Sequence, residues 1–347
     1  MAFRVLVAGG AGLVGSAVAR QLLTEGAEVA IVDAMGTGGD GRAVREERVQ
    51  VLRSFSKATI VTADLSLPGA ASDVFRDVKP AAVVNAALFP PGAPGVESIL
   101  EAMRGDEPPF LVHLSDGALY PAPASPGQPA IEEEPSDPGS DPVLLQRLVE
   151  ESRLRGSGLP NVILRLFGIL APGAPPNRFP QDALETLLDG REVVVSSDAP
   201  RDLLHLGDAV HGILAALALR PSGRTINLGS GRGVAPAHVV RLLGERSFRQ
   251  ARVRVGQAPV RPERIASLAR ASELLRFQAR TTLETAVEEI VAARLGAPES
   301  TSTRPRPSAP AVSPSARRPP DGDEPKEVSR RELFGFLRRP FDGGRPR

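Results

Sequence analysis

The chain contains no cysteine and a single tyrosine, Tyr120, in 347 residues. Without cysteine it forms no disulfide and offers no thiolate as a nucleophile or metal ligand. This composition fits a reducing compartment, so we expect a cytoplasmic protein. The four histidines are scattered without the spacing of metal ligands, and no metal site is predicted. Any reaction that needs a phenol would have to use Tyr120.

An excess of charge of one sign is also missing. Lys and Arg total 42 and Asp and Glu total 41, which gives a net charge of +1. This balance argues against a general nucleic-acid-binding surface, and no apolar run is long enough to span a bilayer. Residues 1–295 are rich in Ala, Val and Leu, enough for a sizeable core. The chain begins on a run that reads as a core strand, so we expect no signal peptide.

Short β-rich runs alternate with helical patterns in the first half of the chain. The predicted strands are Arg4–Ala8, Val29–Val32, Thr59–Ala63, Ala82–Asn85, Leu111–Leu114 and Val162–Leu166. Such alternation is typical of an α/β fold with a doubly wound parallel sheet of the Rossmann type. We expect this domain to occupy residues 1–170, with later segments returning to it. A smaller α/β lobe over residues 171–295, with helices at 208–219 and 237–243, should cover the carboxyl edge of the sheet.

The composition changes after residue 295. Residues 296–328 are rich in Pro, Ser, Arg and Ala, cannot bury a core, and are expected to be disordered. Within 329–347 the apolar pattern returns after Ser329, which opens a capping box. We expect residues 329–341 to form a short amphipathic helix that docks on a protein partner. The segment 335–339 is similar to the cargo peptides of encapsulin shells. A helix that folds back on its own domain and a basic segment that touches anionic lipid are the alternatives.

A glycine-rich loop separates the first predicted strand from the first helix. Its residues are Gly9, Gly10, Ala11, Gly12, Leu13, Val14 and Gly15. Gly9 permits a tight turn, Gly12 lets a pyrophosphate approach the helix N-terminus, and Gly15 lets helix and strand pack closely. Asp33 ends the second strand, where a carboxylate accepts hydrogen bonds from a ribose diol and repels a 2′-phosphate. We therefore expect NAD rather than NADP. The alternatives are a domain without nucleotide and Asp33 as a solvated strand end.

Two further strand ends supply candidates for cofactor binding. Asp64 and Leu65 end the third strand, and Asn85, Ala86 and Ala87 end the fourth. Both ends fall at the carboxyl edge, where ligands bind to open α/β sheets. Asp64 is placed to hold the adenine amino group or, equally, to cap the next helix. Ala86 and Ala87 are small enough to let the cofactor pass close to the backbone.

With these motifs the chain resembles the extended short-chain dehydrogenases/reductases, the NAD-dependent epimerase/dehydratase family, over residues 3–295. Further motifs agree in order: Leu114–Tyr120, Leu164–Gly168, Arg201–Asp208 and Asn227–Gly231. The resemblance implies a Rossmann domain with NAD, a small lobe for a nucleotide sugar, and a homodimer formed through a helix pair. It also implies a tyrosine that abstracts a hydroxyl proton while hydride moves to the nicotinamide. A lysine four residues later and a serine or threonine assist that tyrosine.

The expected tyrosine and lysine are absent. The pair corresponds to Pro142 and Gln146 without a gap, or to Val143 and Arg147 with a shift of one residue. Neither pair supplies a base with a usable pKa, because arginine stays protonated. Tyr120 matches the family's structural tyrosine rather than its catalytic one. The loss therefore does not depend on the alignment.

Three residues remain as catalytic candidates. Asp116 stands at the serine or threonine position and would act as a base if burial raised its pKa. The alternative for Asp116 is a polar residue at a strand end. Ser115 directly precedes it in the same motif. Arg147 can still hold the nicotinamide ribose as a hydrogen-bond donor.

The resemblance also implies residues that bind the substrate. Arg201 and Arg261 correspond to arginines that contact the nucleotide diphosphate, which two guanidinium groups can bind in bidentate fashion. Asn177 is a further polar contact, and ordinary ion pairing is the alternative for both arginines. Three functional hypotheses follow. The chain is an NAD-dependent enzyme with altered catalytic groups, a non-catalytic NAD-binding sensor, or a scaffold or cargo protein whose tail is the functional part.

Overall fold

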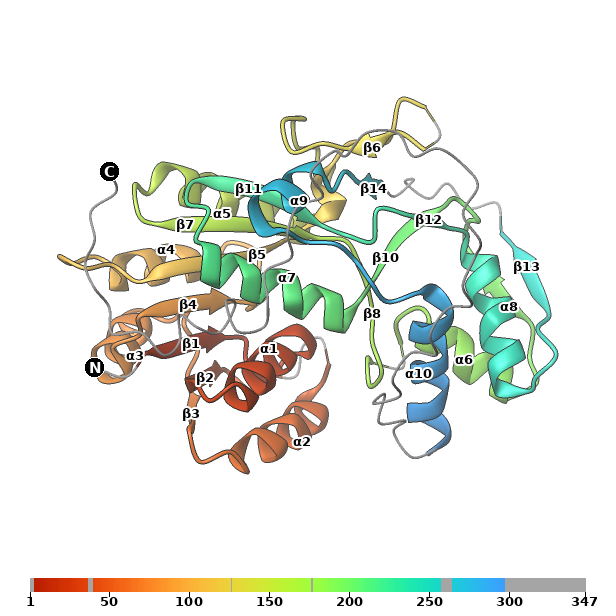
Figure 1. Cartoon of the computed structure of the whole chain (residues 1–347), viewed down its shortest axis with the longest axis horizontal. Coiled ribbons are helices and arrows are strands. Elements are labelled where there is room, and N and C mark those ends of the chain that lie inside the picture. Colours follow the sequence, from red (N-terminus) through yellow and green to blue (C-terminus); the bar gives the residue numbers. More distant parts are fainter. Residues whose placement is uncertain (1–2, 37–39, 126, 176, 257–263, 297–347) are drawn as a thin grey trace, which may run out of the picture.

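A parallel sheet of seven strands forms the largest part of the computed structural model (Figure 1). The structure describes residues 3–36, 40–125, 127–175, 177–256 and 264–296. The predictions for Arg261 and for the tail from residue 297 onward lie outside these residues. The strand order is β11-β7-β5-β4-β1-β2-β3, and every neighbouring pair is parallel.

The strands of the sheet are short, and all except the edge strand β3 are mostly buried. They are β1 (Arg4–Ala8), β2 (Glu28–Asp33), β3 (Ala58–Thr62), β4 (Ala82–Asn85), β5 (Phe110–Asp116), β7 (Asn161–Leu166) and β11 (Arg224–Leu228). In β4 all residues are buried, as expected for a parallel strand covered on both sides. The predicted β1 and β4 match the observed bounds, and the other predicted strands differ by one or two residues at their ends. The predicted fold class is confirmed.

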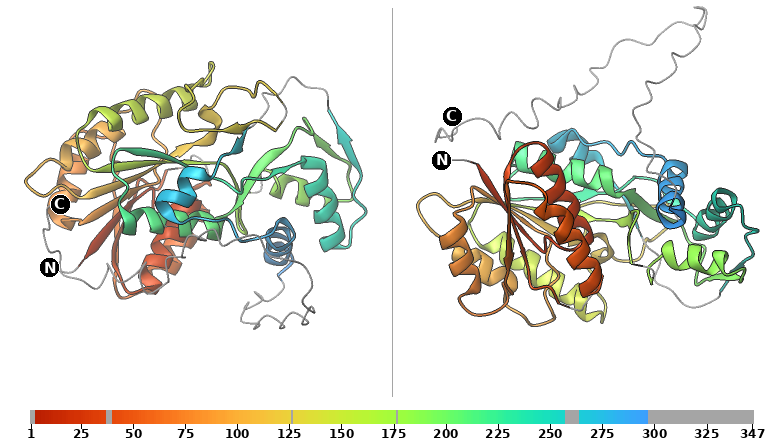
Figure 2. Two further views of the ribbon diagram at one scale, coloured as in Figure 1. Left: turned by 45° about the horizontal axis from the view of Figure 1, so that its top comes forward. Right: turned by 90° about the horizontal axis from the view of Figure 1, so that it is seen from below.

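Helices cover both faces of this sheet, which makes it doubly wound (Figure 2). On one face, α1 (Leu13–Thr24), α7 (Leu206–Leu219) and α9 (Ala269–Leu275) pack into one apolar core. On the other, α3 (Ala70–Val78), α4 (Gly95–Ala102) and α5 (Pro142–Gly156) contribute to a second core. Asp141 caps the N-terminus of α5, because its side chain accepts from two backbone N–H groups of the first turn. Pro142 is the first residue of the helix, a position that proline favours.

The small lobe has a core of its own beside the sheet. This core joins α6 (Gln181–Leu188), α8 (Pro236–Ser247) and α10 (Leu283–Leu295) with β9 (Val193–Val195) and β13 (Val253–Val255). Three more strands, β8 (Gly168–Leu170), β10 (Arg201–His205) and β12 (Gly233–Val234), lie between the lobe and the large sheet (Figure 1). Both α7 and β11 pack with the large sheet although they follow residue 170. The chain therefore crosses between the two parts more than once.

None of the described helices combines the length and the apolar character needed to cross a bilayer. Within the described ranges, no three His, Cys, Asp or Glu side chains lie close enough together to hold a metal ion. Polar groups of the large sheet gather instead near the carboxyl ends of its strands, where Asp33, Asn85 and Asp116 end β2, β4 and β5.

Candidate functional site

A cleft of about 860 Å³ lies at the carboxyl ends of the central strands, on the side that faces the small lobe. Most predicted site residues lie in its wall: Gly9, Gly12, Leu13, Val14, Gly15, Asp33, Asp64, Leu65, Ala86, Ala87, Ser115, Asp116 and Arg147. Asn85, Asn177 and Arg201 are described but are not part of the wall. The sheet thus gathers residues from separate segments around one space.

The glycine loop forms a close-fitting cradle at the start of α1. Gly9 has a φ of +70°, and a Cβ there would lie 2.6 Å from the backbone nitrogen of Ala87. A Cβ on Gly15 would lie 2.2 Å from the carbonyl oxygen of Gly9. Gly12 begins α1 without a side-chain cap, and the first turn carries no acidic residue. The backbone N–H groups at this end are therefore open to an anion, which fits the pyrophosphate of NAD.

Asp33 lies buried at the end of β2 and is already engaged by the protein. Its carboxylate accepts hydrogen bonds from the backbone N–H groups of Ala11 at 3.0 Å and Met35 at 2.9 Å. Arg45, from α2 (Arg42–Arg53), donates to it at 2.8 Å. Sequence reasoning missed Arg45, because a helical position does not reveal which strand end it meets. A ribose diol bound here would share the carboxylate with Arg45.

Asp64 and Asn85 shape turns next to the cleft. Asp64 Oδ1 accepts from the backbone N–H and the hydroxyl of Ser66, at 2.9 and 2.6 Å. Asn85 is fully buried, and its Oδ1 accepts from the backbone N–H of Ala87 at 3.2 Å. Its Nδ2 lies 3.0 Å from Nδ1 of His113. Asn85 therefore holds the turn after β4 in place rather than facing a ligand.

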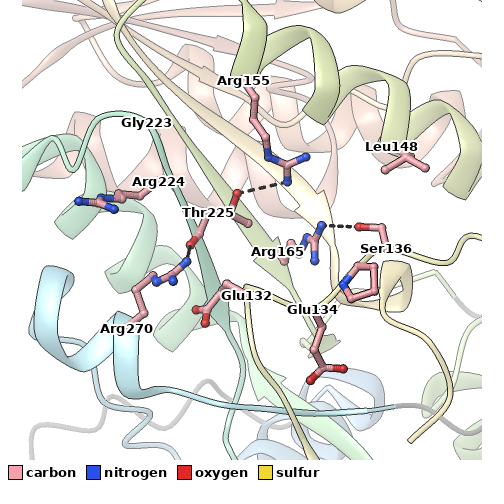
Figure 3. Close-up of a pocket in the computed structure, with 11 residues that line it drawn as sticks. Glu132, Glu134, Ser136, Leu148, Arg155, Arg165, Gly223, Arg224, Thr225 and Arg270 are labelled. Carbon is pink, nitrogen blue, oxygen red and sulfur yellow. Dashed lines mark hydrogen bonds between the residues drawn. The ribbon is translucent and has the colours of Figure 1, made fainter.

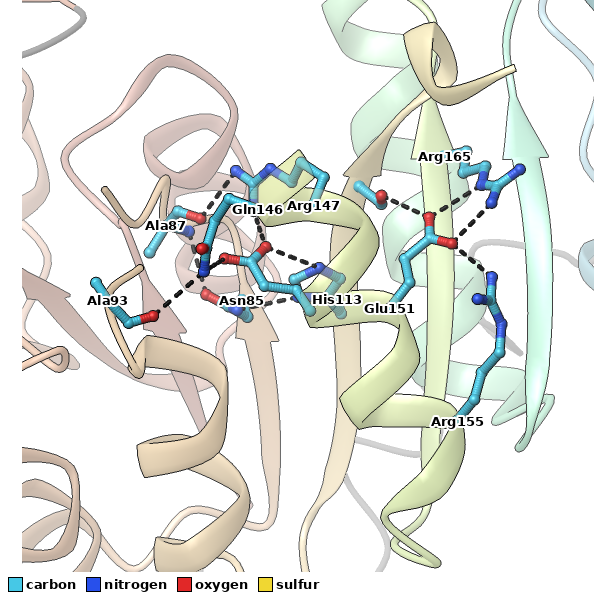
Figure 4. Close-up of polar contacts among 11 residues, drawn as sticks. Asn85, Ala87, Ala93, His113, Gln146, Arg147, Glu151, Arg155 and Arg165 are labelled. Carbon is cyan, nitrogen blue, oxygen red and sulfur yellow. Dashed lines mark hydrogen bonds and ion pairs between the residues drawn. The ribbon is translucent and has the colours of Figure 1, made fainter. Parts of the chain in front are cut away.

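The two candidates for the lysine position, Gln146 and Arg147, belong to a buried polar cluster on α5 (Figure 4). Arg147 donates from Nη1 to Glu150 at 2.6 Å and from Nη2 to the carbonyl oxygen of Ala87 at 3.2 Å. Gln146 donates to Glu150 and to a loop carbonyl before α4, each at 3.2 Å. Arg147 lines the cleft and Gln146 does not. This geometry favours Val143 and Arg147 as the counterparts of the tyrosine and lysine.

A second buried cluster is centred on Glu151, the next residue of α5 (Figure 4). Glu151 accepts from the hydroxyl of Ser115 at 2.6 Å and from Nε and Nη2 of Arg165 at 2.9 and 2.7 Å. Arg155 also pairs with it. Burial acts to raise the pKa of Glu151, but the hydrogen bonds and charge of Arg165 bring that pKa below its usual value. The Ser115 hydroxyl therefore donates into the protein rather than into the cleft.

His113 lies fully buried on β5, close to the first cluster. Because the Asn85 side-chain oxygen accepts from Ala87, its nitrogen faces the ring, so His113 Nδ1 accepts. The ring proton then sits on Nε2, which lies 3.7 Å from a carboxylate oxygen of Glu150. Burial, aided by the charge of Arg147, lowers the pKa of His113 to about 3. Burial raises the pKa of Glu150.

We expect His113 to make the protein less stable in acid. Its pKa is about 3 in the folded protein against an ordinary value of 6.5, so only the unfolded chain takes up a proton between these values. Stability from this residue is therefore full above pH 6.5 and falls as the pH drops towards 3. The loss is about 1.4 kcal/mol per pH unit within that window.

Denaturant unfolding of the wild type and of His113→Gln across this window measures the effect. The variant should lose less stability in acid, because glutamine does not titrate. Glu150, whose pKa is raised, gains a proton in the folded state and acts in the opposite direction in both proteins. An equal loss in the wild type and the variant would contradict the assignment to His113.

Tyr120 borders the cleft, but its hydroxyl is engaged. The side chain is buried, and its hydroxyl donates to Asn227 Oδ1 at 2.7 Å. The guanidinium of Arg165 lies 4.6 Å from the ring centre, and the ring of Phe167 stacks against it. Burial raises the pKa of Tyr120. This tyrosine is therefore a poor proton acceptor and serves the packing between β5, β7 and β11.

Asp116 remains as the acidic group at the base of the cleft. It ends β5 and is open to the cleft, and its Oδ1 accepts from the backbone N–H of Ala118 at 2.8 Å. This bond caps the short helix η1 (Gly117–Leu119). The walls of the cleft around Asp116 raise its pKa by partial desolvation, although the hydrogen bond from Ala118 and the charge of Arg147 act to lower it. Asp116 thus has a structural role in the described protein and stays a chemical candidate.

The lobe side of the cleft carries two arginines that sequence reasoning missed, Arg178 and Arg264. Arg264 is held by both carboxylate oxygens of Glu134, at 2.9 and 2.8 Å. Arg178 is exposed and directly follows the predicted Asn177, which lies outside the wall. Arg201 contacts the ring of Phe179, 5.9 Å from its centre, and Phe179 lines the cleft. No motif or spacing pattern in the sequence pointed to Arg178 or Arg264.

A second cavity of about 380 Å³ opens at the β11 edge of the sheet (Figure 3). Its lining includes Glu132, Glu134, Arg155, Arg165, Arg224 and Arg270. Three of these arginines are engaged within the protein. Arg155 and Arg165 pair with Glu151, and Arg270 pairs with Glu133 and donates to the carbonyl oxygen of Thr225. These pairs hold α5, β7, β11 and α9 together, so the cavity belongs to the structural framework.

Known proteins match the chain along most of its length. The profile of the NAD dependent epimerase/dehydratase family matches residues 5–229. A UDP-glucose 4-epimerase of Streptomyces lividans is 28% identical over 265 residues, which cover 69% of this chain and 80% of that enzyme. A UDP-glucose 4-epimerase of Azospirillum brasilense is 28% identical over 295 residues, which cover 71% and 78%.

Solved structures share the fold. UDP-glucuronic acid 4-epimerase from Bacillus cereus, in complex with UDP-glucuronic acid and NAD, has a TM-score of 0.74 at 20% identity, covering 84% of this chain and 100% of that chain. dTDP-glucose 4,6-dehydratase from Bacillus anthracis, in complex with NAD, has a TM-score of 0.77 at 18% identity, covering 85% and 97%. The family match and the glycine cradle together identify NAD as the cofactor. The chain belongs to the NAD dependent epimerase/dehydratase family.

Proposed function

We propose that this protein binds NAD and a nucleotide-sugar-type ligand in the cleft, and that the redox cycle of its relatives is lost. The relatives are UDP-glucose 4-epimerases, and the Bacillus cereus neighbour was solved with NAD and a UDP sugar. One observation carries the loss. The exposed Val143 and the ion-paired Arg147 stand where the family's tyrosine and lysine are expected.

The glycine cradle would hold the cofactor. Gly9 and Gly12 leave room for the pyrophosphate at the open end of α1, and Asp33 would accept from the adenosine ribose. NAD, when bound, supplies a centre that accepts and returns hydride. Arg147 would donate to the nicotinamide ribose from a position held by Glu150 and by the carbonyl oxygen of Ala87.

The lobe side of the cleft would hold the diphosphate of the second ligand. Arg178 and Arg264 line this side, and guanidinium groups bind phosphates in bidentate fashion. Arg264 keeps a fixed position, because it also donates to the carbonyl oxygens of Pro121 and Pro129. Arg201 does not line the cleft, but its guanidinium contacts Phe179, which does, and would add positive charge to this side. The cleft would then offer cationic groups to the negative charge of a nucleotide diphosphate.

Release of bound small molecules tests the proposed binding. The purified protein is denatured, and the released compounds are identified by mass spectrometry. We expect NAD together with a nucleotide sugar. Titration calorimetry with added NAD should then show binding that Gly12→Ala weakens by about tenfold or more, because a methyl group intrudes where the pyrophosphate lies.

Gly105→Ala is the matched control, since its new Cβ has no atom within 4 Å. At Gly12 the new Cβ would lie 3.2 Å from the Gly9 carbonyl oxygen, a close contact that the loop can relieve by a small shift. Thermal unfolding of both ligand-free variants should therefore stay near that of the wild type. If no preparation releases a dinucleotide and added NAD does not bind, the proposal fails.

A second candidate function keeps catalysis and assigns the base to Asp116. Two observations favour it: the carboxylate is open to the cleft, and the surrounding protein raises its pKa. A carboxylate with a raised pKa is a better proton acceptor near neutral pH. This candidate differs from the first only in whether hydrogen is exchanged between ligand and cofactor.

A further inference from the structure

Phe248 stands at an unusual place in the fold. It follows α8 with φ of +55° and ψ of +37°, the left-handed conformation, and it is 94% exposed. Its position ends the helix: the backbone N–H of Arg249 donates to the carbonyl oxygen of Gly244 at 2.8 Å. Glycine is the residue favoured at such a helix end, because other side chains crowd the backbone there.

Within the described protein, phenylalanine is unfavourable here for two separate reasons. A bulky residue in the left-handed region strains the backbone. The ring also leaves its apolar surface in water, where it contributes nothing to a core. The hydrogen bonds that end α8 use main-chain groups and need no aromatic ring. The fold therefore gives no account of Phe248, and a partner that receives the ring would.

Arginines surround this ring in the sequence. Residues 241–255 contain five arginines and one glutamate. Arg246, Arg249 and Arg252 lie within four residues of Phe248, and all three are exposed. Arg254 on β13 pairs with Glu192, so its charge is compensated. The turn between α8 and β13 thus carries an exposed aromatic ring, with exposed arginines before and after it in the sequence.

This turn lies at the far end of the small lobe. In Figure 1, α8 and β13 form the end of the molecule opposite the large sheet, and Figure 2 shows the same from two further directions. None of the residues 241–255 lines the cleft. A surface bound at this end would therefore leave the cleft open to small molecules.

We propose that Phe248, with Arg246, Arg249 and Arg252, binds the surface of anionic lipid membranes. The ring would enter the interface between head groups and acyl chains, and the guanidinium groups would bind lipid phosphates. Lipid fits this turn better than a protein does, because a single projecting ring needs a pocket in a protein but is received by a deformable lipid surface. The positive charge is complementary to the anionic head groups.

Vesicle sedimentation with the full-length protein tests this proposal. We expect binding to vesicles that mix phosphatidylcholine with phosphatidylglycerol, weaker binding at high salt, and little binding to phosphatidylcholine alone. Phe248→Asp should weaken the binding by about tenfold or more, since the ring leaves the acyl boundary. Arg249→Gln with Arg252→Gln should weaken it by about 25-fold, since each arginine near an anionic surface contributes about a fivefold increase.

Phe248→Gly separates binding from folding. Glycine relieves the left-handed backbone and removes the exposed ring, so this variant should unfold about 1–3 °C higher than the wild type while it binds vesicles as weakly as Phe248→Asp. Val51→Asp and Arg53→Gln on α2 are matched controls, because both residues are exposed on the large domain. They should bind like the wild type.

Three outcomes would overturn the proposal. The wild type fails to bind the anionic vesicles. The variants at Phe248, Arg249 and Arg252 bind as the wild type does, which would assign the binding to another segment such as residues 297–347. In the third outcome, the turn binds soluble polyglutamate as strongly as it binds the anionic vesicles, which would point to an acidic protein as the partner instead of lipid.

Discussion

Replacement of Arg147 by methionine is expected to lower the free energy of unfolding by about 3–5 kcal/mol at neutral pH. Arg147 is buried and pairs at 2.6 Å with Glu150, which is fully buried. Without the guanidinium, Glu150 either stays charged and buried with Gln146 as its remaining side-chain donor, or takes up a proton. Burial already raises the pKa of Glu150, so the unpaired carboxyl should protonate readily as the pH falls. The destabilisation should therefore be larger at neutral pH than in mild acid.

Denaturant unfolding of three variants measures this effect. Arg147→Met with Glu150→Gln removes both charges and should recover most of the loss, because a neutral amide replaces the carboxylate. Arg153→Met on the same helix is the control: its pair with Glu97 is exposed and should contribute less than about 1 kcal/mol. If Arg147→Met alone unfolds within about 0.5 kcal/mol of the wild type, the buried pair does not have the role assigned to it.

The second large effect concerns the chemistry of the cleft. Supplied with NAD and deuterium-labelled UDP-glucose, the protein is expected to bind both without moving the label to the cofactor. A positioned acid or base contributes about 10²–10⁴ to such rates. In the proposed correspondence Val143 takes the place of the tyrosine, and Arg147, which stays protonated, takes the place of the lysine. The rate of exchange should therefore lie at least two to four orders of magnitude below that of an intact relative assayed in parallel.

Asp116→Asn decides between the two proposed functions. If the wild type exchanges label and Asp116→Asn does not, Asp116 is the base and the proposed loss of the redox cycle is wrong. If neither protein exchanges label while both bind NAD, the non-catalytic proposal stands. Asp116 also caps η1 through the backbone N–H of Ala118, a bond that asparagine can keep. Thermal unfolding of the variant shows whether the fold is preserved.

Much of this site could be predicted because its parts are local in the sequence. Gly9 and Gly15 are six residues apart, so the close approach of Gly15 to the Gly9 carbonyl oxygen is set by a single short loop. Asp33 and Asp116 end apolar runs, and the ends of parallel strands meet at one edge of the sheet. The cleft wall therefore contains most of the predicted cofactor residues.

Other expectations depended on contacts that no local pattern reveals. Ser115 is a hydroxyl at a strand end, but its partner Glu151 is 36 residues away and faces inward from α5. Asn85 ends β4 like a ligand-binding residue, yet it is fully buried and binds His113. Later segments are expected to return to the large domain, but no local pattern reveals that β11 pairs with β7 at the edge of the large sheet.

The sequence by itself determined the α/β fold, the NAD cradle and the presence of a single tyrosine, because these follow from hydrophobic periodicity, glycine spacing and composition. The tertiary structure alone decided where the charges of the chain lie. It buried Glu150 and Glu151 of α5 against Arg147 and Arg165, paired Asp33 with Arg45, and left Phe248 in water. Such choices depend on distances between residues remote in sequence, and Coulomb and burial energies change steeply with those distances.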